Sequence, residues 1–256
     1  MMLNYLVILQ ARMESTRLPG KVLMPICGKP MIELQIARIL RSNLISDLVV
    51  AIPDTAENDV LSDHLEKLNV KVFRGSHLNV FERYLNTSRK YPSKSIIRLT
   101  ADCPLVMPDL IDKMIEHFNS IEVDYLSNTL TESFPDGLDI EIFRTKVLFR
   151  LKEFELNSQE KEFVTLGIYQ RPENFLIEKF ESKTFLGDER WTVDYPEDFE
   201  FVTKVFTFFK GNKSEFNTQD VLSYIDLDPS NKNQKPAGYR NIALKSSNFF
   251  EPDTIA

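Results

Sequence analysis

Three cations follow the first apolar run of the chain at short intervals. Arg12, Arg17 and Lys21 stand in the stretch LQARMESTRLPGKVL, directly behind the apolar YLVI. Polar residues and the Pro19-Gly20 pair separate them, so the spacing predicts a loop at a strand end rather than a helix face. Arginine's planar fork suits phosphate oxygens, and lysine supplies a point charge. Because neither a GxGxxG nor a Walker A pattern occurs, these side chains would supply much of the charge that meets an anionic ligand. The alternative is a solvated basic loop.

Two aspartates could hold a metal ion beside these cations. Asp102 in LTADCPL and Asp194 in WTVDYPED each follow an apolar run and precede a proline within two residues. Both are therefore expected at strand ends rather than inside a ladder. Magnesium commonly uses one or two carboxylates together with substrate phosphates. The pair thus predicts a magnesium site, whereas either aspartate taken singly is better explained as a cap of the following turn.

The elements that would position these residues alternate between apolar runs and amphipathic stretches. This alternation is typical of βαβ units and favours an α/β fold with a mostly parallel sheet. Ligands of such sheets bind outside the carboxyl ends of the strands, where the loop and both acids would gather. The expected strands cover 5–9, 47–52, 71–75, 95–102, 123–128 and 190–194, and the expected helices cover 30–40, 57–68, 80–90, 108–119, 146–156, 158–170 and 197–209.

Other segments complete the expected organisation. Residues 138–143 and 175–181 alternate apolar and polar side chains, as strands with one wet face do. Beyond Gly211 the chain is polar, with one short helix expected at 218–225. We therefore expect one main domain over 1–210 and a polar appendage over 211–256. The helix at 57–68 should direct one set of side chains inward: Val60, Leu61, His64, Leu65 and Leu68.

Composition and charge exclude several functional classes. The chain has 256 residues, enough for a sizeable core, and a formal net charge of −7 at pH 7. A field of that sign repels nucleic acid. No apolar run approaches the roughly 18 residues of a membrane span, and the first residues do not match a signal peptide. The distant Cys27 and Cys103 favour neither a disulfide nor a zinc site, so we expect a cytoplasmic protein.

Four motifs carry a resemblance to a known family. IxxARMxSTRLPGKVL, RLTADCPL, FPDGLDIEIF and TVDYPEDFEFV, in that order, resemble the spore coat polysaccharide biosynthesis protein F family over about residues 4 to 209. That family is related to the cytidylyltransferases that make CMP-activated 3-deoxy-manno-octulosonate. The resemblance implies a Rossmann-like nucleotidyltransferase (GT-A-like) three-layer fold with a mixed, mostly parallel sheet and a small antiparallel extension. It also implies CTP and a small-molecule acceptor as ligands, Mg²⁺ as the cofactor, and a homodimer with 138–143 and 175–181 as candidate contacts.

The resemblance assigns roles to individual residues. Arg12, Lys21, Asp102 and Asp194 would be catalytic, and the two aspartates would bind Mg²⁺. The nucleotide would be bound by residues of the first loop, of an Arg-Gly-Ser element and of the Asp102 motif: Gln10, Ala11, Arg12, Ser15, Arg17, Lys21, Arg74, Thr100 and Ala101. The acceptor would be bound by residues of FPDGLDIEIF and of a later helix: Asp136, Gly137, Asp139, Glu141 and Glu162.

The chain departs from its relatives at two places. It has Ala101-Asp102-Cys103-Pro104 where the sugar-acid enzymes have Gly-Asp-Glu-Pro, and Lys-Glu-Phe-Val-Thr at 161–165 where relatives usually have Arg-Glu-His-Val-Thr. Phe163 therefore replaces a histidine close to the acceptor. Cys103 invites a nucleophile interpretation, but its motif contains no histidine to activate it, so a packing role is favoured.

The implied reaction is a cytidylyl transfer. An acceptor hydroxyl or phosphate oxygen attacks the α-phosphorus of CTP, and pyrophosphate leaves. The acceptor would be a sugar, a sugar acid or a polyol-type compound used for surface polysaccharide or glycan synthesis. A glycosyltransferase that uses a nucleotide sugar stays open, although such folds normally hold metal with Asp-x-Asp and Asp102 stands alone in Ala-Asp-Cys. The third hypothesis is a protein that binds a nucleotide as a partner without catalysing a reaction.

Overall fold

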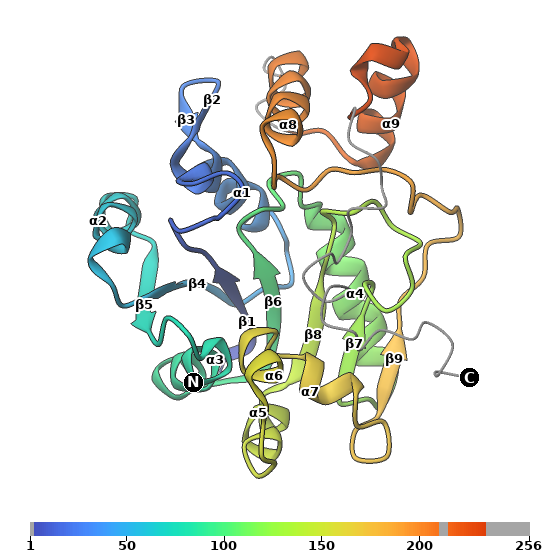
Figure 1. Ribbon diagram of the computed structural model, residues 1–256. Coiled ribbons are helices and arrows are strands. Elements are labelled where there is room, and N and C mark those ends of the chain that lie inside the picture. The colour runs from blue at the N-terminus through green and yellow to red at the C-terminus, as the bar shows by residue number, and fades with distance from the viewer. Residues whose placement is uncertain (1–2, 210–214, 234–256) are drawn as a thin grey trace.

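A seven-stranded sheet forms the centre of the protein (Figure 1). The computed structural model describes residues 3–209 and 215–233. Strands follow the order β5-β4-β1-β6-β8-β7-β9, and neighbours run parallel except around β8, which is antiparallel to β6 and β7. The sheet consists of β1 Leu3–Gln10, β4 Asp47–Pro53, β5 Lys71–Gly75, β6 Ser93–Thr100, β7 Tyr125–Ser127, β8 Glu141–Arg144 and β9 Ile177–Lys179, and a separate hairpin consists of β2 Pro25–Ile26 and β3 Lys29–Pro30.

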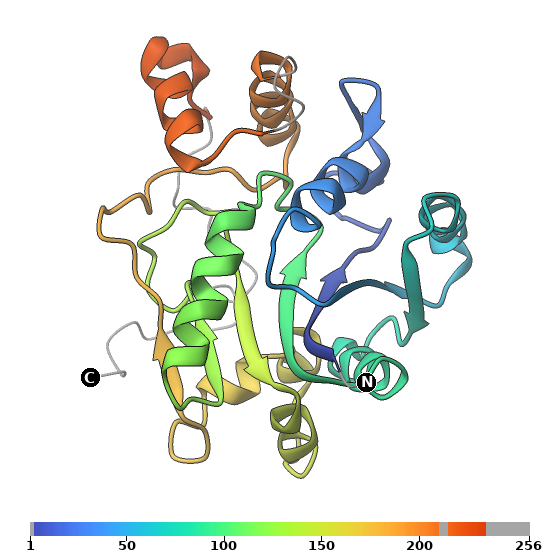
Figure 2. The ribbon, with the colours of Figure 1, turned by 180° about the vertical axis from the view of Figure 1, so that it is seen from behind.

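Helices cover both faces of this sheet and give three layers (Figures 1 and 2). Buried side chains of α1, α2, α4, α8 and α9 share one core cluster, and those of α3, α5 and α7 belong to a second cluster on the other face. The expected three-layer α/β fold is confirmed. The helices are α1 Met31–Ile39, α2 Asp59–Lys67, α3 Val80–Lys90, α4 Pro108–Ser120, α5 Thr145–Leu151, α6 Ser158–Glu162, α7 Leu166–Tyr169, α8 Pro196–Phe208 and α9 Thr218–Leu227.

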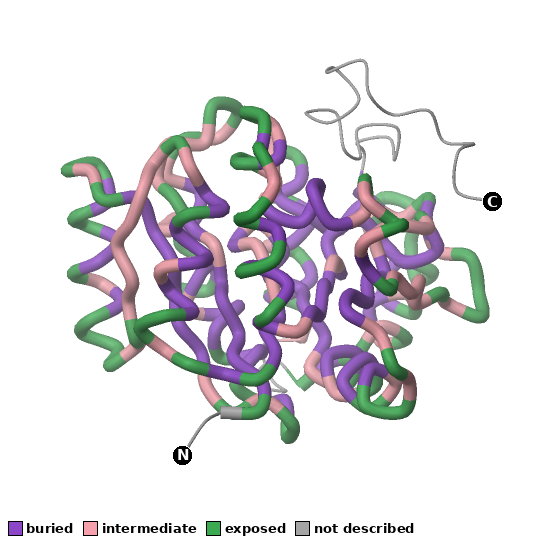
Figure 3. The backbone as a smooth tube through the Cα atoms, turned by 90° about the horizontal axis from the view of Figure 1, so that it is seen from below, coloured by how far each residue is buried: buried purple, intermediate pink, exposed green. Residues whose placement is uncertain are grey.

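Strand β1 lies between the two clusters. Val7 and Leu9 belong to one cluster, Leu6 and Ile8 belong to the other, and all four side chains are fully buried. A strand buried on both faces is expected to be a continuous apolar run, as β1 is. In Figure 3 the buried residues run through the interior, while buried and exposed residues alternate along the helices.

The parallel pairing of β1 and β6 positions the candidate site. Gln10 at the end of β1 is the register partner of Thr100 at the end of β6. The backbone N–H of Ala101 then donates to the carbonyl of Gln10 at 2.9 Å. The Arg12 loop and the Asp102 turn therefore leave the sheet side by side, as the rule for ligand sites in open α/β sheets requires.

The segment 190–194 is not the strand that was predicted for it. Only Arg190 forms a bridge, an isolated one to Asp136, and no described residue of the segment joins a ladder. The backbone N–H of Val193 instead donates to the carbonyl of Asp102 at 2.8 Å. Residues 190–193 are all buried. A short run of buried residues occurs in extended backbone with or without a ladder, so the run did not distinguish this crossing segment from a strand.

Several helical predictions also needed correction. The helix predicted for 146–156 ends at Leu151, and the helix predicted for 158–170 divides into α6 and α7. Val164 lies at that division with φ 47°, which ends α6 because a β-branched residue in the left-handed region cannot continue a helix. On the helix predicted for 57–68, Val60 and Leu68 were expected inside but are 54% and 36% exposed, since α2 ends at Lys67 and its buried stripe is narrower than predicted.

Residues 215–233 pack against the main sheet domain. The predicted helix at 218–225 is present as α9, and its Val221, Tyr224 and Ile225 join the same core cluster as α1 and α4. The rest of the expected appendage, 211–214 and 234–256, lies outside the described residues. No helix in the described part of the chain is both long enough and apolar enough to cross a membrane.

Candidate active site

The ends of β1 and β6, together with the first loop, enclose a pocket of about 150 Å³, here called the cationic pocket. Three cations and two carboxylates contribute to its lining. Every residue that the sequence assigned to the nucleotide lines it except Arg74, and Thr16 and Val22 line it in addition. The lining residues are Gln10, Ala11, Arg12, Ser15, Thr16, Arg17, Lys21, Val22, Thr100, Ala101, Asp102 and Asp194.

Gly20 turns the first loop so that Lys21 enters this pocket. Its φ of 71° lies in the left-handed region, and its N–H donates to the carbonyl of Met13 at 2.9 Å. A short 3₁₀ helix, Lys21–Leu23, follows at once. Glycine takes that backbone conformation without steric cost. Lys21 is consequently buried, with only 8% of its surface exposed.

The Lys21 ammonium lies between the two aspartates predicted to bind metal. Its Nζ donates to Asp194 Oδ1 at 3.1 Å and to the Val193 carbonyl at 2.6 Å, and it lies 3.6 Å from Asp102 Oδ2. Arg17 Nη2 is 2.7 Å from the same Asp194 oxygen. The structure therefore brings Asp102 and Asp194 to one cation. The first loop contacts the acids directly and does not face them across an open space.

Asp102 is stabilised as a carboxylate. Burial would raise its pKa, but the charge of Lys21 and hydrogen bonds from Thr100 and Cys103 outweigh that effect and lower the pKa from its ordinary value of 3.8. Thr100 Oγ1 donates to Asp102 Oδ1 at 2.5 Å. By contrast, burial and the charge of Asp102 raise the pKa of the Cys103 thiol. Cys103 is therefore kept as a thiol, which agrees with a packing role.

Asp102 and Asp194 fit a divalent cation that arrives with phosphate. Within 3–209 and 215–233 no three histidine, cysteine or acidic side chains cluster as a metal cage would. Magnesium is satisfied by one or two carboxylates when phosphate oxygens and water complete its shell. The oxygen-only donors of this pair, already gathered around a positive charge, match that requirement.

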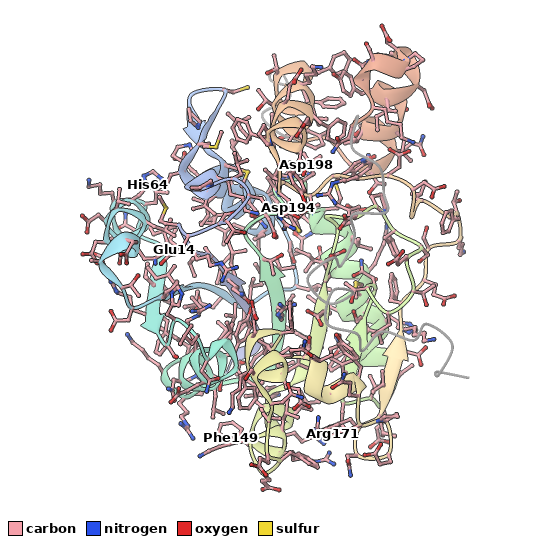
Figure 4. All side chains as sticks on the ribbon, viewed as in Figure 1. Glu14, His64, Phe149, Arg171, Asp194 and Asp198 are labelled. Carbon is pink, nitrogen blue, oxygen red and sulfur yellow. The ribbon has the colours of Figure 1, made fainter. Side chains whose placement is uncertain are left out.

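A buried arginine contacts the carboxylate oxygen of Asp194 that Lys21 and Arg17 do not contact. Arg190 is 2% exposed and contacts three carboxylates: Asp136 at 2.7 Å, Asp198 at 2.9 Å and Asp194 at 3.4 Å. Asp198 also accepts the backbone N–H groups of Asp194 and Tyr195, each at 2.9 Å. Figure 4 shows Asp198 at the base of α8 and Asp194 just below that helix, at this end of the sheet. Asp136, assigned to the acceptor from sequence, thus contributes to this network.

A second pocket, of about 230 Å³, adjoins the first and is called the acidic pocket. It shares Thr100 and Asp102 with the cationic pocket, so Asp102 stands at their junction. Because β8 is inserted antiparallel beside β6, Glu141 lies opposite Arg98 in the ladder. The lining residues are Arg98, Leu99, Thr100, Asp102, Thr129, Asp139, Glu141, Phe163, Thr165 and Tyr169.

Glu141 is the centre of a hydrogen-bond network in the acidic pocket. It forms an ion pair with Arg98 and accepts from the Tyr125 hydroxyl at 2.5 Å and from Thr165 Oγ1 at 2.6 Å. Burial lowers the pKa of Arg98, but Glu141 outweighs burial and raises it. Burial and the charge of Glu141 also raise the pKa values of Tyr125 and Tyr169, so both phenols keep their protons.

Three other predicted residues lie elsewhere. Gly137 has φ 109°, and a Cβ there would meet the backbone nitrogen of Thr192 at 2.4 Å, so it allows close backbone packing. Glu162 is exposed on α6 and lines neither pocket. Arg74 lines neither pocket and forms ion pairs with Asp54 and Asp59. The reasoning from sequence missed Thr129 and Tyr169, which no motif marks, and it assigned no role to Thr165. Phe163, which departs from the family pattern, lines the acidic pocket.

Comparisons with known proteins agree with this geometry. A family profile described as "Cytidylyltransferase" matches residues 6–224, which include the lining of both pockets. An uncharacterized protein from Methanocaldococcus jannaschii is 30% identical, over 92% of this chain and 97% of its own. The spore coat polysaccharide biosynthesis protein SpsF from Bacillus subtilis is 30% identical, over 91% of this chain and 99% of its own.

A solved structure extends the agreement to three dimensions. The structure of a cytidylyltransferase from Leptospira borgpetersenii serovar Hardjo-bovis superposes with a TM-score of 0.86 at 29% identity, over 91% of this chain and 98% of that one. The resemblance drawn from the four motifs is confirmed, as is the nucleotidyltransferase fold. The chain belongs to the cytidylyltransferase family and is a CTP-dependent nucleotidyltransferase.

Proposed function

We propose that this enzyme transfers CMP from CTP to a hydroxyl of a sugar, sugar-acid or polyol-type acceptor in polysaccharide or glycan synthesis. The observation that carries the proposal is the meeting of the two pockets at Asp102. One pocket gathers cations that suit a triphosphate, and the other gathers carboxylates and hydroxyls that suit an acceptor. The acceptor oxygen forms a bond to the α-phosphorus, the bond to the bridging oxygen of pyrophosphate breaks, and the acceptor proton is released.

The residues of the cationic pocket would neutralise charge on the triphosphate. Arg12, Arg17 and Lys21 would contact the β and γ phosphates, which requires Arg17 and Lys21 to exchange Asp194 for phosphate oxygens. Asp102 and Asp194 would hold Mg²⁺, which when bound supplies positive charge to the phosphates. Their alignment by Lys21 and Arg190 exists before the ligand arrives. Loss of one such preorganised contact commonly lowers the rate by about 10²–10³-fold.

Product identity tests the proposal. The enzyme would be mixed with Mg²⁺, each of the four nucleoside triphosphates and a pool of candidate acceptors, and pyrophosphate would be measured. We expect pyrophosphate release with CTP well above that with ATP or GTP, and an acceptor-linked CMP. Release of a nucleoside diphosphate from nucleotide sugars would instead identify a glycosyltransferase, and binding of CTP without any turnover would identify a silent partner.

We also propose a cytoplasmic homodimer. The cytoplasm supplies CTP, and the expected dimer contact at 175–181 contains β9, the edge strand of the sheet, with Leu176 59% exposed. The other expected contact, 138–143, was wrong because β8 lies inside the sheet and Leu138, Ile140 and Ile142 are fully buried. Light scattering at micromolar concentration should give twice the chain mass, and a monomer would rule out the dimer without affecting the chemistry.

A further inference from the structure

We propose that Asn233 is a positioning residue for Asp194. This proposal rests on the proposed function, because it takes Asp194 to be a ligand of the Mg²⁺ ion that accompanies CTP. Asn233 lines neither pocket and lies beyond residues 6–224, which the family profile matches. It would act on the site through Asp198 and through the backbone of Arg190. The segment 215–233 would then contribute to the active site as well as to the core.

The side-chain amide of Asn233 is buried against the segment that carries Asp194. Its Nδ2 donates to Asp198 Oδ1 at 2.9 Å and to the carbonyl oxygen of Arg190 at 3.0 Å, and the residue is only 7% exposed. A side-chain amide nitrogen carries two hydrogens, one for each of these acceptors. An apolar side chain in its place would remove a donor from two buried oxygens at once.

Both residues that accept these bonds support Asp194 directly. Asp198 Oδ2 accepts the backbone N–H groups of Asp194 and Tyr195, and thereby fixes the backbone at Asp194. Arg190 Nη2 lies 3.4 Å from Asp194 Oδ2 and so contacts its side chain. The amide of Asn233 therefore restrains both the carboxylate that fixes this backbone and the arginine that contacts this side chain.

This support becomes more important when nucleotide binds. In the free enzyme Lys21 and Arg17 also contact Asp194 Oδ1. If both cations turn toward phosphate, the contacts that Asp194 keeps among the described residues are those with Arg190 and Asp198. Magnesium demands near-ideal octahedral geometry, and residues that orient metal ligands commonly contribute about 10- to 100-fold to metal affinity. A loosened Asp194 should therefore weaken metal binding more than it weakens binding of the nucleotide alone.

Attachment of residues 215–233 does not depend on Asn233. Arg38 Nη2 donates to the carbonyl of Phe216 at 3.1 Å, and the Arg38 guanidinium lies 3.9 Å from the centre of the Phe216 ring. Val221 of α9 is fully buried in the same core cluster as α1 and α4. Loss of the Asn233 amide should therefore leave the segment packed, so its effect on metal binding can be measured in a folded protein.

Asn233→Leu tests the proposal, because leucine is close to asparagine in size and donates no hydrogen bond. Calorimetric titration of the full chain would give the Kd of CTP with EDTA and with excess Mg²⁺, and the ratio of the two values is the enhancement by metal. We expect Asn233→Leu to lower that ratio by about tenfold, the lower end of the range for residues that orient a metal ligand. The Kd with EDTA should stay unchanged.

Two further variants separate positioning from a structural role. Asn231→Leu is the matched control, because the Asn231 amide donates to the carbonyl of Tyr224 at 2.9 Å, within residues 215–233 themselves. It should leave the enhancement by metal unchanged. Asn233→Ala admits water to the two acceptors and should lower the enhancement in the same direction, which provides the test should Asn233→Leu not fold. Thermal unfolding reports the stability of each variant.

The outcomes decide between the two roles. A lower enhancement in the Asn233 variants, with Asn231→Leu like wild type, supports the proposal even where their thermal midpoints also fall. An unchanged enhancement in a folded Asn233 variant overturns it and assigns Asn233 to stability alone. A wild-type enzyme that releases pyrophosphate from CTP but shows no enhancement by Mg²⁺ would also overturn it. Failure of the proposed function is distinguished by the absence of both pyrophosphate release and CTP binding in wild type.

Discussion

Lys21 is the residue at which the cations of the first loop meet the two aspartates of the site. In the absence of nucleotide its ammonium neutralises Asp102 and Asp194, two carboxylates that would otherwise repel each other. If triphosphate binds here, the ammonium would turn toward phosphate, and Asp102 and Asp194 would then be available to hold the proposed metal ion. One buried cation would thus prepare the site for a nucleotide that brings negative phosphates together with a positive metal ion.

Substitution of Lys21 should therefore separate the contribution of the β and γ phosphates to binding from that of the nucleoside. We expect Lys21→Met to weaken CTP binding about 10- to 100-fold, the range for a hydrogen bond to a charged group, and to change CMP binding much less. Isothermal titration calorimetry with both nucleotides measures this. Lys29→Met is the control, since Lys29 is 58% exposed and pairs only with Glu33 among the described ion pairs. Equal losses for CTP and CMP would mean that Lys21 contacts the nucleoside or only supports the fold.

Residue types were the most informative part of the sequence for the site. Arg12, Lys21 and Asp102 could be identified because the sequence alone shows charged residues and the ends of apolar strands. Tyr169 could not, because it reaches the acidic pocket through a tertiary contact of a short helix that no periodicity describes. Asp136 was assigned to the acceptor because its motif suggested it, but the buried Arg190 accounts for its charge.

At the scale of elements, the segment between β9 and α8 supports the site without belonging to the sheet. Arg190 joins this segment to the turn that contains Asp136 and to the first turn of α8 through Asp198. Asp198 also accepts a hydrogen bond from Asn233 at 2.9 Å, so the end of the described chain is joined to the same point. The Arg190 guanidinium thus links the Asp136 turn to the start of α8, and Asp198 extends the network to Asn233.

Removal of that guanidinium should cost stability. Arg190→Met would remove the buried guanidinium that pairs with Asp136 and Asp198, and we expect the free energy of unfolding to fall by about 3–5 kcal/mol. Urea denaturation followed by circular dichroism measures it. Lys113→Met, at an ion pair with Asp109 in which both side chains are more than half exposed, is the control and should change stability by less than about 1 kcal/mol. A loss for Arg190→Met no larger than the control would show that the network is not structural.

The elements that the sequence placed well are those with strong local signals. Strands such as β1 and β4 are continuous apolar runs, and α4 begins at Pro108 where the first-turn proline predicted it. Predictions failed where tertiary contacts determine the backbone conformation. Val164 ends α6 with a strained backbone, and 190–194 crosses the end of the core as an extended segment without a ladder. Neither outcome follows from propensity or alternation alone.

At the scale of the whole molecule, buried phenols limit stability at high pH. Burial raises the pKa of Tyr84 to about 12 from its ordinary value of 10, and burial with the charge of Glu141 raises those of Tyr125 and Tyr169. A folded state that keeps protons which the unfolded chain releases loses stability as pH rises above 10. Each such phenol contributes a slope of about 1.4 kcal/mol per pH unit.

Thermal unfolding between pH 8 and pH 12 tests this expectation. The midpoint should be flat to about pH 10 and then fall steeply, and Tyr84→Phe should fall less steeply than wild type. The Tyr84 hydroxyl donates a long hydrogen bond, 3.4 Å, to the Ile8 carbonyl and also interacts with Arg98, so the substitution removes the ionisable group together with these two contacts. Parallel curves for the variant and the wild type would show that ionisation of Tyr84 does not contribute.

The cooperation of Asp102 and Asp194 is the central claim, and the rate of pyrophosphate release in a double-mutant cycle tests it most directly. Asp102→Asn and Asp194→Asn should each lower turnover with MgCTP and acceptor by about 10²–10³-fold, because both would hold the same ion. The double variant should be little worse than either single one, as groups that act as a unit are strongly non-additive. Near-normal turnover in either single variant, or losses that multiply in the double variant, would contradict a shared metal site.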